Sequence, residues 1–147
     1  YMSYKGIYRP SNPKKYKGDS QNIIYRSLWE RKFMNYCDLN ENILEWASEE
    51  FWIPYLDPTT NRVRRYFPDF FIKYKDKDSN IRRSVIEVKP MRETLEPKVT
   101  KGKSRKTMIN ESLTYVKNQA KWKAAKEFCA DRKLEFKIMT EKELGIR

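Results

Sequence analysis

Three residues in two apolar segments carry side chains that could do phosphate chemistry. Asp69 lies in Tyr66-Phe67-Pro68-Asp69-Phe70-Phe71-Ile72, while Glu87 and Lys89 lie in Ser84-Val85-Ile86-Glu87-Val88-Lys89. Because side chains alternate between the faces of a strand, Glu87 and Lys89 point the same way, and pairing of the two segments would bring Asp69 beside them. Two carboxylates with an adjacent lysine can hold a magnesium ion and activate a water molecule next to a phosphate.

The chain contains no histidine, and this excludes several kinds of catalytic site. A Ser-His-Asp or Cys-His device cannot form. Zinc sites built on histidine are excluded too, and two cysteines cannot supply a site made of thiolates alone. Catalysis in this chain must therefore use carboxylates, lysine, tyrosine or a metal-bound water.

The net charge of the 147-residue chain is +12. An excess of this size favours a polyanion such as nucleic acid as partner, or an anionic membrane surface. No apolar stretch approaches the roughly 20 residues that span a bilayer, and no secretory signal is visible, so we expect no membrane partner. The positions of Cys37 and Cys129 in apolar patterns favour buried free thiols over a disulfide.

The elements that must position the candidate site begin with a basic arm and a helix. Residues 1–19 combine glycine, proline and basic residues, so we expect an irregular arm that is ordered only where it docks, followed by a single domain over residues 20–147. Asp19 or Ser20 can cap a helix over about 21–38. One stripe of this helix is largely apolar but contains a glutamate, and it consists of Ile23, Ser27, Glu30, Met34 and Cys37. The alternative for Glu30 is a surface ion pair with Arg26.

The middle of the chain predicts an antiparallel meander of short strands. The expected strands cover 43–46, 51–55, 62–75 and 81–89, with a turn over 56–61 and a polar hairpin tip over 75–80. Pro90 ends the last strand, and residues 91–107 form a loop or a short helix. A long helix over 108–132 follows, with an apolar stripe of Ile109, Leu113, Val116, Ala120, Ala124 and Phe128. A strand over 134–139 and a helical turn over 140–143, stopped by Gly145, complete one α/β domain.

The spacing of Pro68-Asp69 and Glu87-Val88-Lys89 matches the pattern of the PD-(D/E)xK nuclease superfamily. Further segments, namely Ser27-Leu28-Trp29-Glu30-Arg31-Lys32-Phe33, Trp46, Tyr66-Phe67-Pro68-Asp69-Phe70 and Ile86-Glu87-Val88-Lys89-Pro90, resemble its TnsA-like branch. More narrowly, they resemble the head-completion endonucleases of contractile-tailed bacteriophages, over about Tyr25 to Phe136. The resemblance implies a restriction-endonuclease-like α/β core with a mixed central sheet of about four to five strands flanked by helices.

The resemblance also implies a set of metal ligands. Asp69 and Glu87 correspond to the ligands themselves, and the carbonyl of Val88 is a further one. Glu30 corresponds to the helix glutamate that helps to complete the site. The implied cofactor is Mg²⁺, with Mn²⁺ as the alternative, because both are bound by oxygen ligands.

Two further residues receive catalytic roles from the resemblance. Lys89 corresponds to the motif lysine, which can orient or deprotonate the attacking water. Gln119 matches a helix glutamine of related nucleases, and Tyr115 precedes it by one turn. The alternatives are an ion pair between Lys89 and Glu87 without catalytic meaning, an ordinary surface amide at Gln119 and a core-edge aromatic at Tyr115.

Basic residues around the motifs are candidates for holding DNA. Phosphate contacts need charge rather than base recognition, so we expect binding that tolerates sequence and depends strongly on salt. The candidates are Arg64, Arg65, Arg82, Arg83, Lys98, Lys101, Lys103, Arg105, Lys106 and Lys123.

The resulting prediction is a magnesium-dependent endonuclease that acts on double-stranded DNA, at phage genome ends during head completion. Its expected partners beyond DNA are the head portal or neck proteins, in the host cytoplasm or associated with the virion, and a dimer is one open arrangement. One alternative is a DNA-binding virion connector without catalysis. The other is a recombination or repair nuclease that cuts branched DNA.

Overall fold

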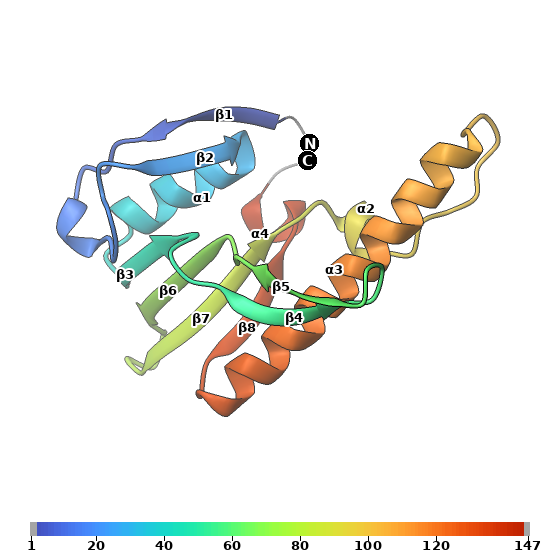
Figure 1. Ribbon diagram of the computed structural model, residues 1–147. Helices are drawn as coiled ribbons and strands as arrows, with labels where there is room; N and C mark the ends of the chain where they lie inside the picture. The colour runs from blue at the N-terminus through green and yellow to red at the C-terminus, as the bar shows by residue number, and fades with distance from the viewer. Residues whose placement is uncertain (1–2, 146–147) are drawn as a thin grey trace.

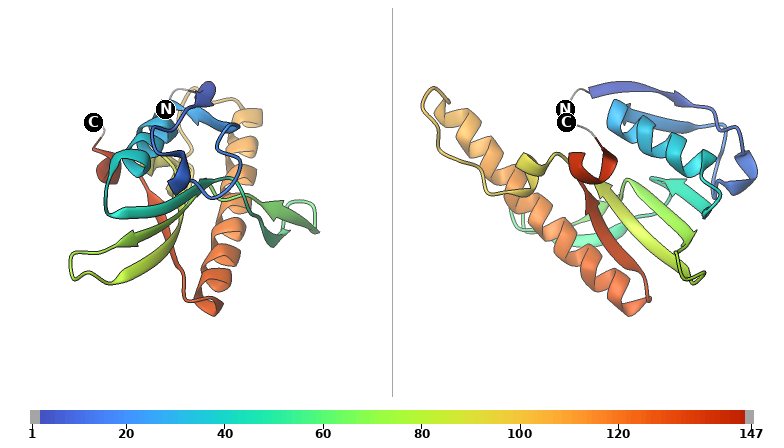
Figure 2. Two further views of the ribbon diagram at one scale, coloured as in Figure 1. Left: turned by 90° about the vertical axis from the view of Figure 1, so that its left-hand side faces the viewer. Right: turned by 180° about the vertical axis from the view of Figure 1, so that it is seen from behind.

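The computed structural model describes residues 3–145, and its centre is a mixed sheet of four strands. Strands β3 (Ile43–Ser48), β6 (Phe70–Lys75) and β7 (Ile81–Val88) are antiparallel neighbours, and β8 (Glu135–Met139) joins β7 in parallel. Helix α1 (Leu28–Leu39) and helix α3 (Arg105–Asp131) lie on opposite sides of this sheet (Figure 2, left). The predicted mixed sheet flanked by helices is confirmed.

The first helix begins later than predicted. Residues Ile23–Ser27 form strand β2, because isoleucine and tyrosine at its start favour extended backbone, and α1 starts only at Leu28. Ser27 is the N-cap: its hydroxyl oxygen accepts the backbone N–H of Glu30 at 3.1 Å. The expected caps Asp19 and Ser20 are therefore wrong.

The described part of the N-terminal arm docks on the domain and is ordered there, as the prediction allowed, but it contains a regular strand where an irregular arm was predicted. Strand β1 (Ser3–Tyr8) pairs antiparallel with β2, and a short 3₁₀ helix η1 (Pro13–Lys15) follows, while residues 1–2 lie outside the described part of the chain. Tyr8 and Tyr16 are buried against Trp46 in the main core. Asp38 on α1 accepts the Tyr8 hydroxyl and two backbone N–H groups of the arm, so docking on α1 orders it.

The predicted strand over 62–75 is two strands with a break at Pro68-Asp69. Strand β5 (Arg62–Tyr66) pairs with β4 (Ile53–Asp57) in a separate two-stranded ribbon, and β6 starts at Phe70. Buried Pro68 lies in the break, where its missing N–H would interrupt any strand ladder. The predicted single meander is therefore wrong, and the β4–β5 ribbon instead packs on α3 through Tyr55, Tyr66 and Trp122.

Helix α3 is longer than predicted, and its buried side is different from the expected stripe. Ser104 caps it, and its buried positions are Asn118, Trp122, Ala125 and Cys129. Ile109, Leu113 and Val116 of the predicted stripe are exposed, because this half of α3 extends past the sheet, as Figure 1 shows. The short helices α2 (Met91–Thr94) and α4 (Glu141–Leu144) flank the end of β7, and Gly145 ends α4 in the left-handed region with φ 69°.

The two cores explain the placement of the remaining sequence features. One core lies between α1 and the sheet around Trp46, Phe70 and Met34, and the other lies between α3 and the sheet. Cys37, in the first core, and Cys129, on the buried side of α3, are buried free thiols, as predicted. Among residues 3–145, no helix is both long and apolar enough to cross a membrane.

Candidate active site

Asp69 and Glu87 face each other at the ends of two paired strands. The β6–β7 register pairs Phe70 with Ile86, and one step further it places Asp69 opposite Glu87. Phe70 and Ile86 point into the main core, so their neighbours in sequence point to the other face, toward α3. The backbone N–H of Val88 donates a hydrogen bond of 2.7 Å to Oδ2 of Asp69. The strands therefore bring the two carboxylates together, as the sequence predicts.

Glu87 is held by a tyrosine and accompanied by the motif lysine. The Tyr66 hydroxyl at the end of β5 donates a hydrogen bond of 2.6 Å to Oε1 of Glu87. The Lys89 ammonium lies 3.9 Å from Oε2 of the same carboxylate, two positions along the chain. Glu87 is only 6% exposed, so this group sits in a site largely shielded from solvent.

Glu30 approaches the pair from the first turn of α1. Its carboxylate is 6% exposed and accepts the Ser27 hydroxyl at 3.3 Å and the Arg26 backbone N–H at 3.5 Å. A carboxylate at a helix N-terminus is favoured by the helix dipole, which eases its burial. The Arg26 side chain bonds Glu49 at 2.9 Å, and Glu30 is buried, so Glu30 is not the surface carboxylate that the alternative expected.

The three carboxylates share one unfavourable environment. Burial raises the pKa of Asp69 well above its usual range, and repulsion by Glu87 and Glu30 raises it further. Burial also raises the pKa of Glu87, against the lowering effect of the Tyr66 hydrogen bond and of Lys89. The pKa of Glu30 is raised mainly by burial. A bound cation would offset the cost of keeping these groups ionised.

Asp69 and Glu87 offer carboxylate oxygens, which are suitable ligands for a hard divalent cation. Oδ2 of Asp69 accepts the Val88 N–H and Oε1 of Glu87 accepts the Tyr66 hydroxyl, which leaves Oδ1 of Asp69 and Oε2 of Glu87 as the oxygens that a cation could use. No three acidic or thiol side chains within residues 3–145 cluster closely enough to form a complete cage. Among these described residues, Glu30 therefore does not complete a three-carboxylate site with Asp69 and Glu87.

Lys121 lies near the carboxylate pair, where the sequence analysis gave it no role. It lies on α3, half-buried, with its ammonium 5.8 Å from the ring centre of Tyr66 and 5.9 Å from that of Tyr55. Burial lowers its pKa, while the negative charge of Glu87 acts in the opposite direction. No carboxylate of the described residues forms an ion pair with it. Its spacing in the sequence could have indicated this position. Lys121 follows Asn118 by three residues and Lys117 by four, so all three side chains are neighbours on the helix surface.

Gln119 does not join the carboxylates. It is exposed, and residues two apart on an α-helix point to nearly opposite sides, so Gln119 faces away when Lys121 faces Glu87. Tyr115, one turn before Gln119, is half-buried and lines a groove together with Asn118, whereas Gln119 does not line it. The prediction that Gln119 lies at the site is therefore not supported by its placement.

Some of the predicted DNA-binding side chains have intramolecular partners near the site. Arg64 lies 3.0 Å from Oδ2 of buried Asp57, and Arg65 stacks over Trp52 at 4.7 Å. Lys103 forms an ion pair of 3.0 Å with Glu111. The remaining candidates outside the β7 hairpin are exposed and are Lys98, Lys101, Arg105, Lys106 and Lys123.

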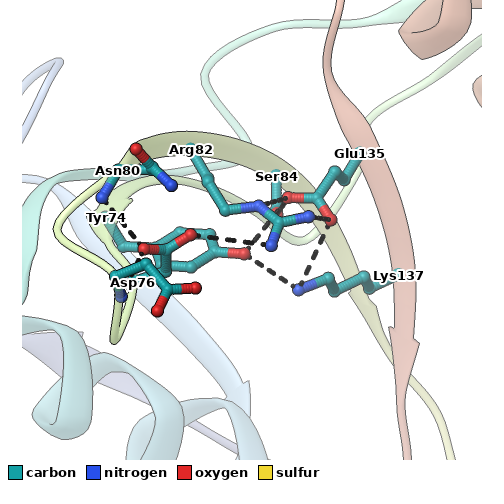
Figure 3. A network of polar contacts seen from close by, with 8 residues as sticks. Tyr74, Asp76, Asn80, Arg82, Ser84, Glu135 and Lys137 are labelled. Carbon is teal, nitrogen blue, oxygen red and sulfur yellow. Dashed lines mark hydrogen bonds and ion pairs between the residues drawn. The ribbon is translucent and has the colours of Figure 1, made fainter.

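Arg82 belongs to a polar network at the far end of the sheet, shown in Figure 3. Its guanidinium donates to both oxygens of Glu135 at 3.1 and 2.9 Å, and Tyr74 donates to the same carboxylate at 3.1 Å. Arg82 is five positions before Glu87 on β7, roughly 17 Å along the strand. This network joins β7 to β8 and accounts for Arg82 without DNA, whereas neighbouring Arg83 is exposed.

The chain is similar to known nucleases along most of its length. Residues 40–141 match the family model described as the TnsA-like endonuclease N-terminal domain. This match contains Asp69, Glu87 and Lys89, while Glu30 lies before it. The chain is also 38% identical over 143 residues to the head completion nuclease of Enterobacteria phage T4, covering 95% of this chain and 93% of that protein.

Proposed function

The chain belongs to the family of TnsA-like endonucleases, and from that premise we propose that it is a divalent-metal-dependent enzyme that hydrolyses double-stranded DNA at phage genome ends during head completion. The observation that carries the proposal is the carboxylate pair of half-buried Asp69 and buried Glu87, with Lys89 beside them. The name of the phage relative supports the setting. Portal or neck proteins are the proposed partners, in the host cytoplasm or on the virion.

Asp69, Glu87 and the carbonyl of Val88 would hold the metal, with Glu30 as the nearby carboxylate that completes the charge. Bound there, Mg²⁺ or Mn²⁺ would act as a Lewis acid toward the phosphate and make bound water more acidic. Val88 N–H and the Tyr66 hydroxyl keep the two carboxylates in fixed orientations. This fixed orientation reduces the reorganisation that the reaction requires.

The two lysines have separate roles in this proposal. Lys89, at 3.9 Å from Glu87, orients the attacking water and offsets the charge that develops on the phosphate. Lys121 lies on the opposite wall, on α3, and its ammonium has no carboxylate partner among the described side chains. It is available to a phosphate oxygen of the bound strand, where a charge-assisted hydrogen bond would position the scissile bond.

A cleavage assay tests the proposed function. The protein is incubated with linear, supercoiled and branched duplex DNA in Mg²⁺, Mn²⁺ or EDTA, over a range of salt concentrations because phosphate binding is salt-dependent. Cleavage of unbranched duplex is expected with metal and not with EDTA. Glu87→Gln should abolish it, while Glu127→Gln, an exposed glutamate on α3, should leave it unchanged.

Two outcomes would replace the proposal by an alternative. Metal-independent binding without cleavage at any salt concentration would favour a virion connector that only binds DNA. Cleavage confined to branched DNA would favour a recombination or repair nuclease.

A further inference from the structure

A groove of about 800 Å³ lies between α3 and the chain segment that follows the catalytic strand. This volume is within the range of clefts that hold small ligands. The groove is lined by residues of segments 92–100 and 103–118, where α3 extends past the sheet (Figure 1). Its outer wall is tied down: the Met91 N–H bonds Glu141 at 2.8 Å, and the Lys103 ammonium bonds the Lys98 carbonyl at 3.2 Å.

The charges that line the groove balance, which distinguishes it from a phosphate channel. Arg92, Lys98 and Lys103 are offset by three glutamates, Glu93, Glu96 and Glu111. The remaining lining includes a phenol ring, amides and hydroxyls, contributed by Tyr115, Asn110, Asn118, Thr107 and Thr114. A surface of this kind repels no charge and offers both hydrogen bonds and a ring face, which suits a nucleobase better than a phosphate backbone.

Asn118 is the residue of the groove that most clearly lacks a partner. It is 7% exposed, and no described residue makes a hydrogen bond with its side-chain amide. Its amide atoms are not among those that the fold buries without a partner, so a molecule in the groove can reach them, and the carbonyl oxygen and NH₂ group can together bond one edge of a base. Half-buried Tyr115, one turn earlier on α3, supplies a ring beside it.

The groove reaches to within one helical turn of Lys121 on α3. Asn118 precedes Lys121 by three residues, so their side chains are neighbours about 5 Å apart along the helix axis. Lys121 is in the field of Glu87, and the segment that lines the groove starts directly after Lys89 and Pro90. A nucleotide that follows a phosphate at Lys121 would therefore reach Asn118.

We propose that this groove receives an unpaired nucleotide adjacent to the cut, with its base bonded by Asn118 and stacked on Tyr115. The assignment rests on the proposed nuclease function and adds a substrate class to it: DNA with an unpaired end or a base displaced from the duplex. Such a site would place the enzyme at frayed or overhanging ends in preference to uniform duplex.

The test compares two fluorescent DNA probes that share one duplex, one blunt and one with a short unpaired overhang, in both strand polarities. Affinity is measured by anisotropy in EDTA, so loss of cleavage cannot affect it. The wild type should bind one overhang polarity about fivefold to tenfold more tightly than the blunt probe. Asn118→Leu and Tyr115→Leu should reduce this ratio to about one or two and leave blunt affinity unchanged, which also reports that they fold.

Gln119→Leu is the matched control, because it makes the same change one residue away on the exposed side of α3. It should keep the overhang preference. Equal wild-type affinity for all probes would overturn the assignment, and so would an overhang preference that survives in both Asn118→Leu and Tyr115→Leu. The result of the cleavage assay does not depend on these affinity ratios, so failure of the nuclease proposal can be distinguished from failure of the groove proposal.

Discussion

At the scale of single residues, each active-site carboxylate has one oxygen fixed by the fold. Val88 N–H holds Oδ2 of Asp69, and the Tyr66 hydroxyl holds Oε1 of Glu87. The two groups repel each other in a site that burial has largely removed from solvent, as their raised pKa values indicate. Without a cation, this arrangement lowers stability in exchange for a preorganised site, a known trade-off between stability and activity.

Asp69→Asn should therefore stabilise the metal-free protein while abolishing cleavage. Asparagine can still accept the Val88 N–H, and it removes one of two neighbouring buried charges. We expect the free energy of unfolding to rise by about 1 kcal/mol, measured by urea denaturation in EDTA. The exposed Asp131→Asn serves as control and should change stability by less than about 0.5 kcal/mol. A loss of stability in Asp69→Asn would contradict the proposed charge repulsion.

Lys121 should matter for cleavage and a surface lysine on the same helix should not. Lys121→Ala removes the ammonium nearest to Glu87 on α3, so we expect the cleavage rate at saturating DNA to fall by about 10-fold to 100-fold. Lys121→Arg should recover part of the rate because it keeps the charge. Lys126→Ala, exposed on α3, should stay within about twofold of wild type. Equal rates for Lys121→Ala and wild type would remove Lys121 from the site.

At the scale of secondary-structure elements, the start of α1 determines where Glu30 lies. Ser27 is both the last residue of β2 and the N-cap of α1, and its hydroxyl also contacts the Glu30 carboxylate at 3.3 Å. One residue thus links the strand, the helix and the third carboxylate.

Ser27→Ala should lower both stability and cleavage, whereas a second cap variant should lower only stability. Loss of an N-cap costs about 1 kcal/mol, and Glu30 also loses its hydroxyl partner. Ser104→Ala removes the equivalent cap of α3, which bonds the Thr107 N–H at 3.1 Å. Thermal unfolding and cleavage rates are measured for both variants, and only Ser27→Ala should cleave DNA more slowly than the wild type. Equal cleavage by the two variants would show that Glu30 needs no positioning by Ser27.

The β4–β5 ribbon is joined to α3 by a buried aspartate with a pH-dependent contribution to stability. The Thr59 hydroxyl bonds Asp57 at 2.6 Å, and this bond is the main reason that the pKa of Asp57 is lowered. A lowered folded-state pKa means that ionised Asp57 stabilises the fold above its unfolded pKa of about 4. That contribution is lost as pH falls through the folded value. Lys117 on α3 lies 3.9 Å from the same carboxylate.

The difference in unfolding free energy between wild type and Asp57→Asn should therefore be present at neutral pH and shrink as pH falls below about 4. Urea denaturation across pH measures it. Asp78→Asn, at the exposed β6–β7 tip, should show no such change with pH. A difference that is constant from neutral to acidic pH would contradict the role assigned to ionised Asp57.

At the scale of the whole molecule, the carboxylate pair could be predicted because it depends on local alternation within two short segments. The two strands are consecutive and joined by one hairpin, so pairing them brings Asp69 opposite Glu87 without any long-range contact. The placement of Gln119 could not be predicted, since it depends on the rotation of α3, and α3 has apolar residues on two sides. The apolar residues Ile109 and Leu113 suggested a core side where the sheet does not reach.

Long-range pairing accounts for the other differences. The arm over 3–8 has few apolar residues to predict a strand, and it becomes one because β2 offers an edge and Asp38 binds the following loop. The break at Pro68 was readable in principle, since proline lacks the N–H that a central strand requires. The net charge did not show which basic residues are available to DNA. Arg64 and Arg82 contribute to the +12, but they form ion pairs with Asp57 and Glu135.

Direct metal binding is the measurement closest to the central claim that Asp69 and Glu87 hold a divalent cation. Titration with Mn²⁺, followed by the loss of the free-ion signal in electron paramagnetic resonance, should show binding to the wild type and to Glu127→Gln. Asp69→Asn and Glu87→Gln should each weaken it by at least about tenfold, because each removes one of the two charged ligands. Mn²⁺ binding of unchanged affinity in the Asp69→Asn, Glu87→Gln double variant would contradict the account.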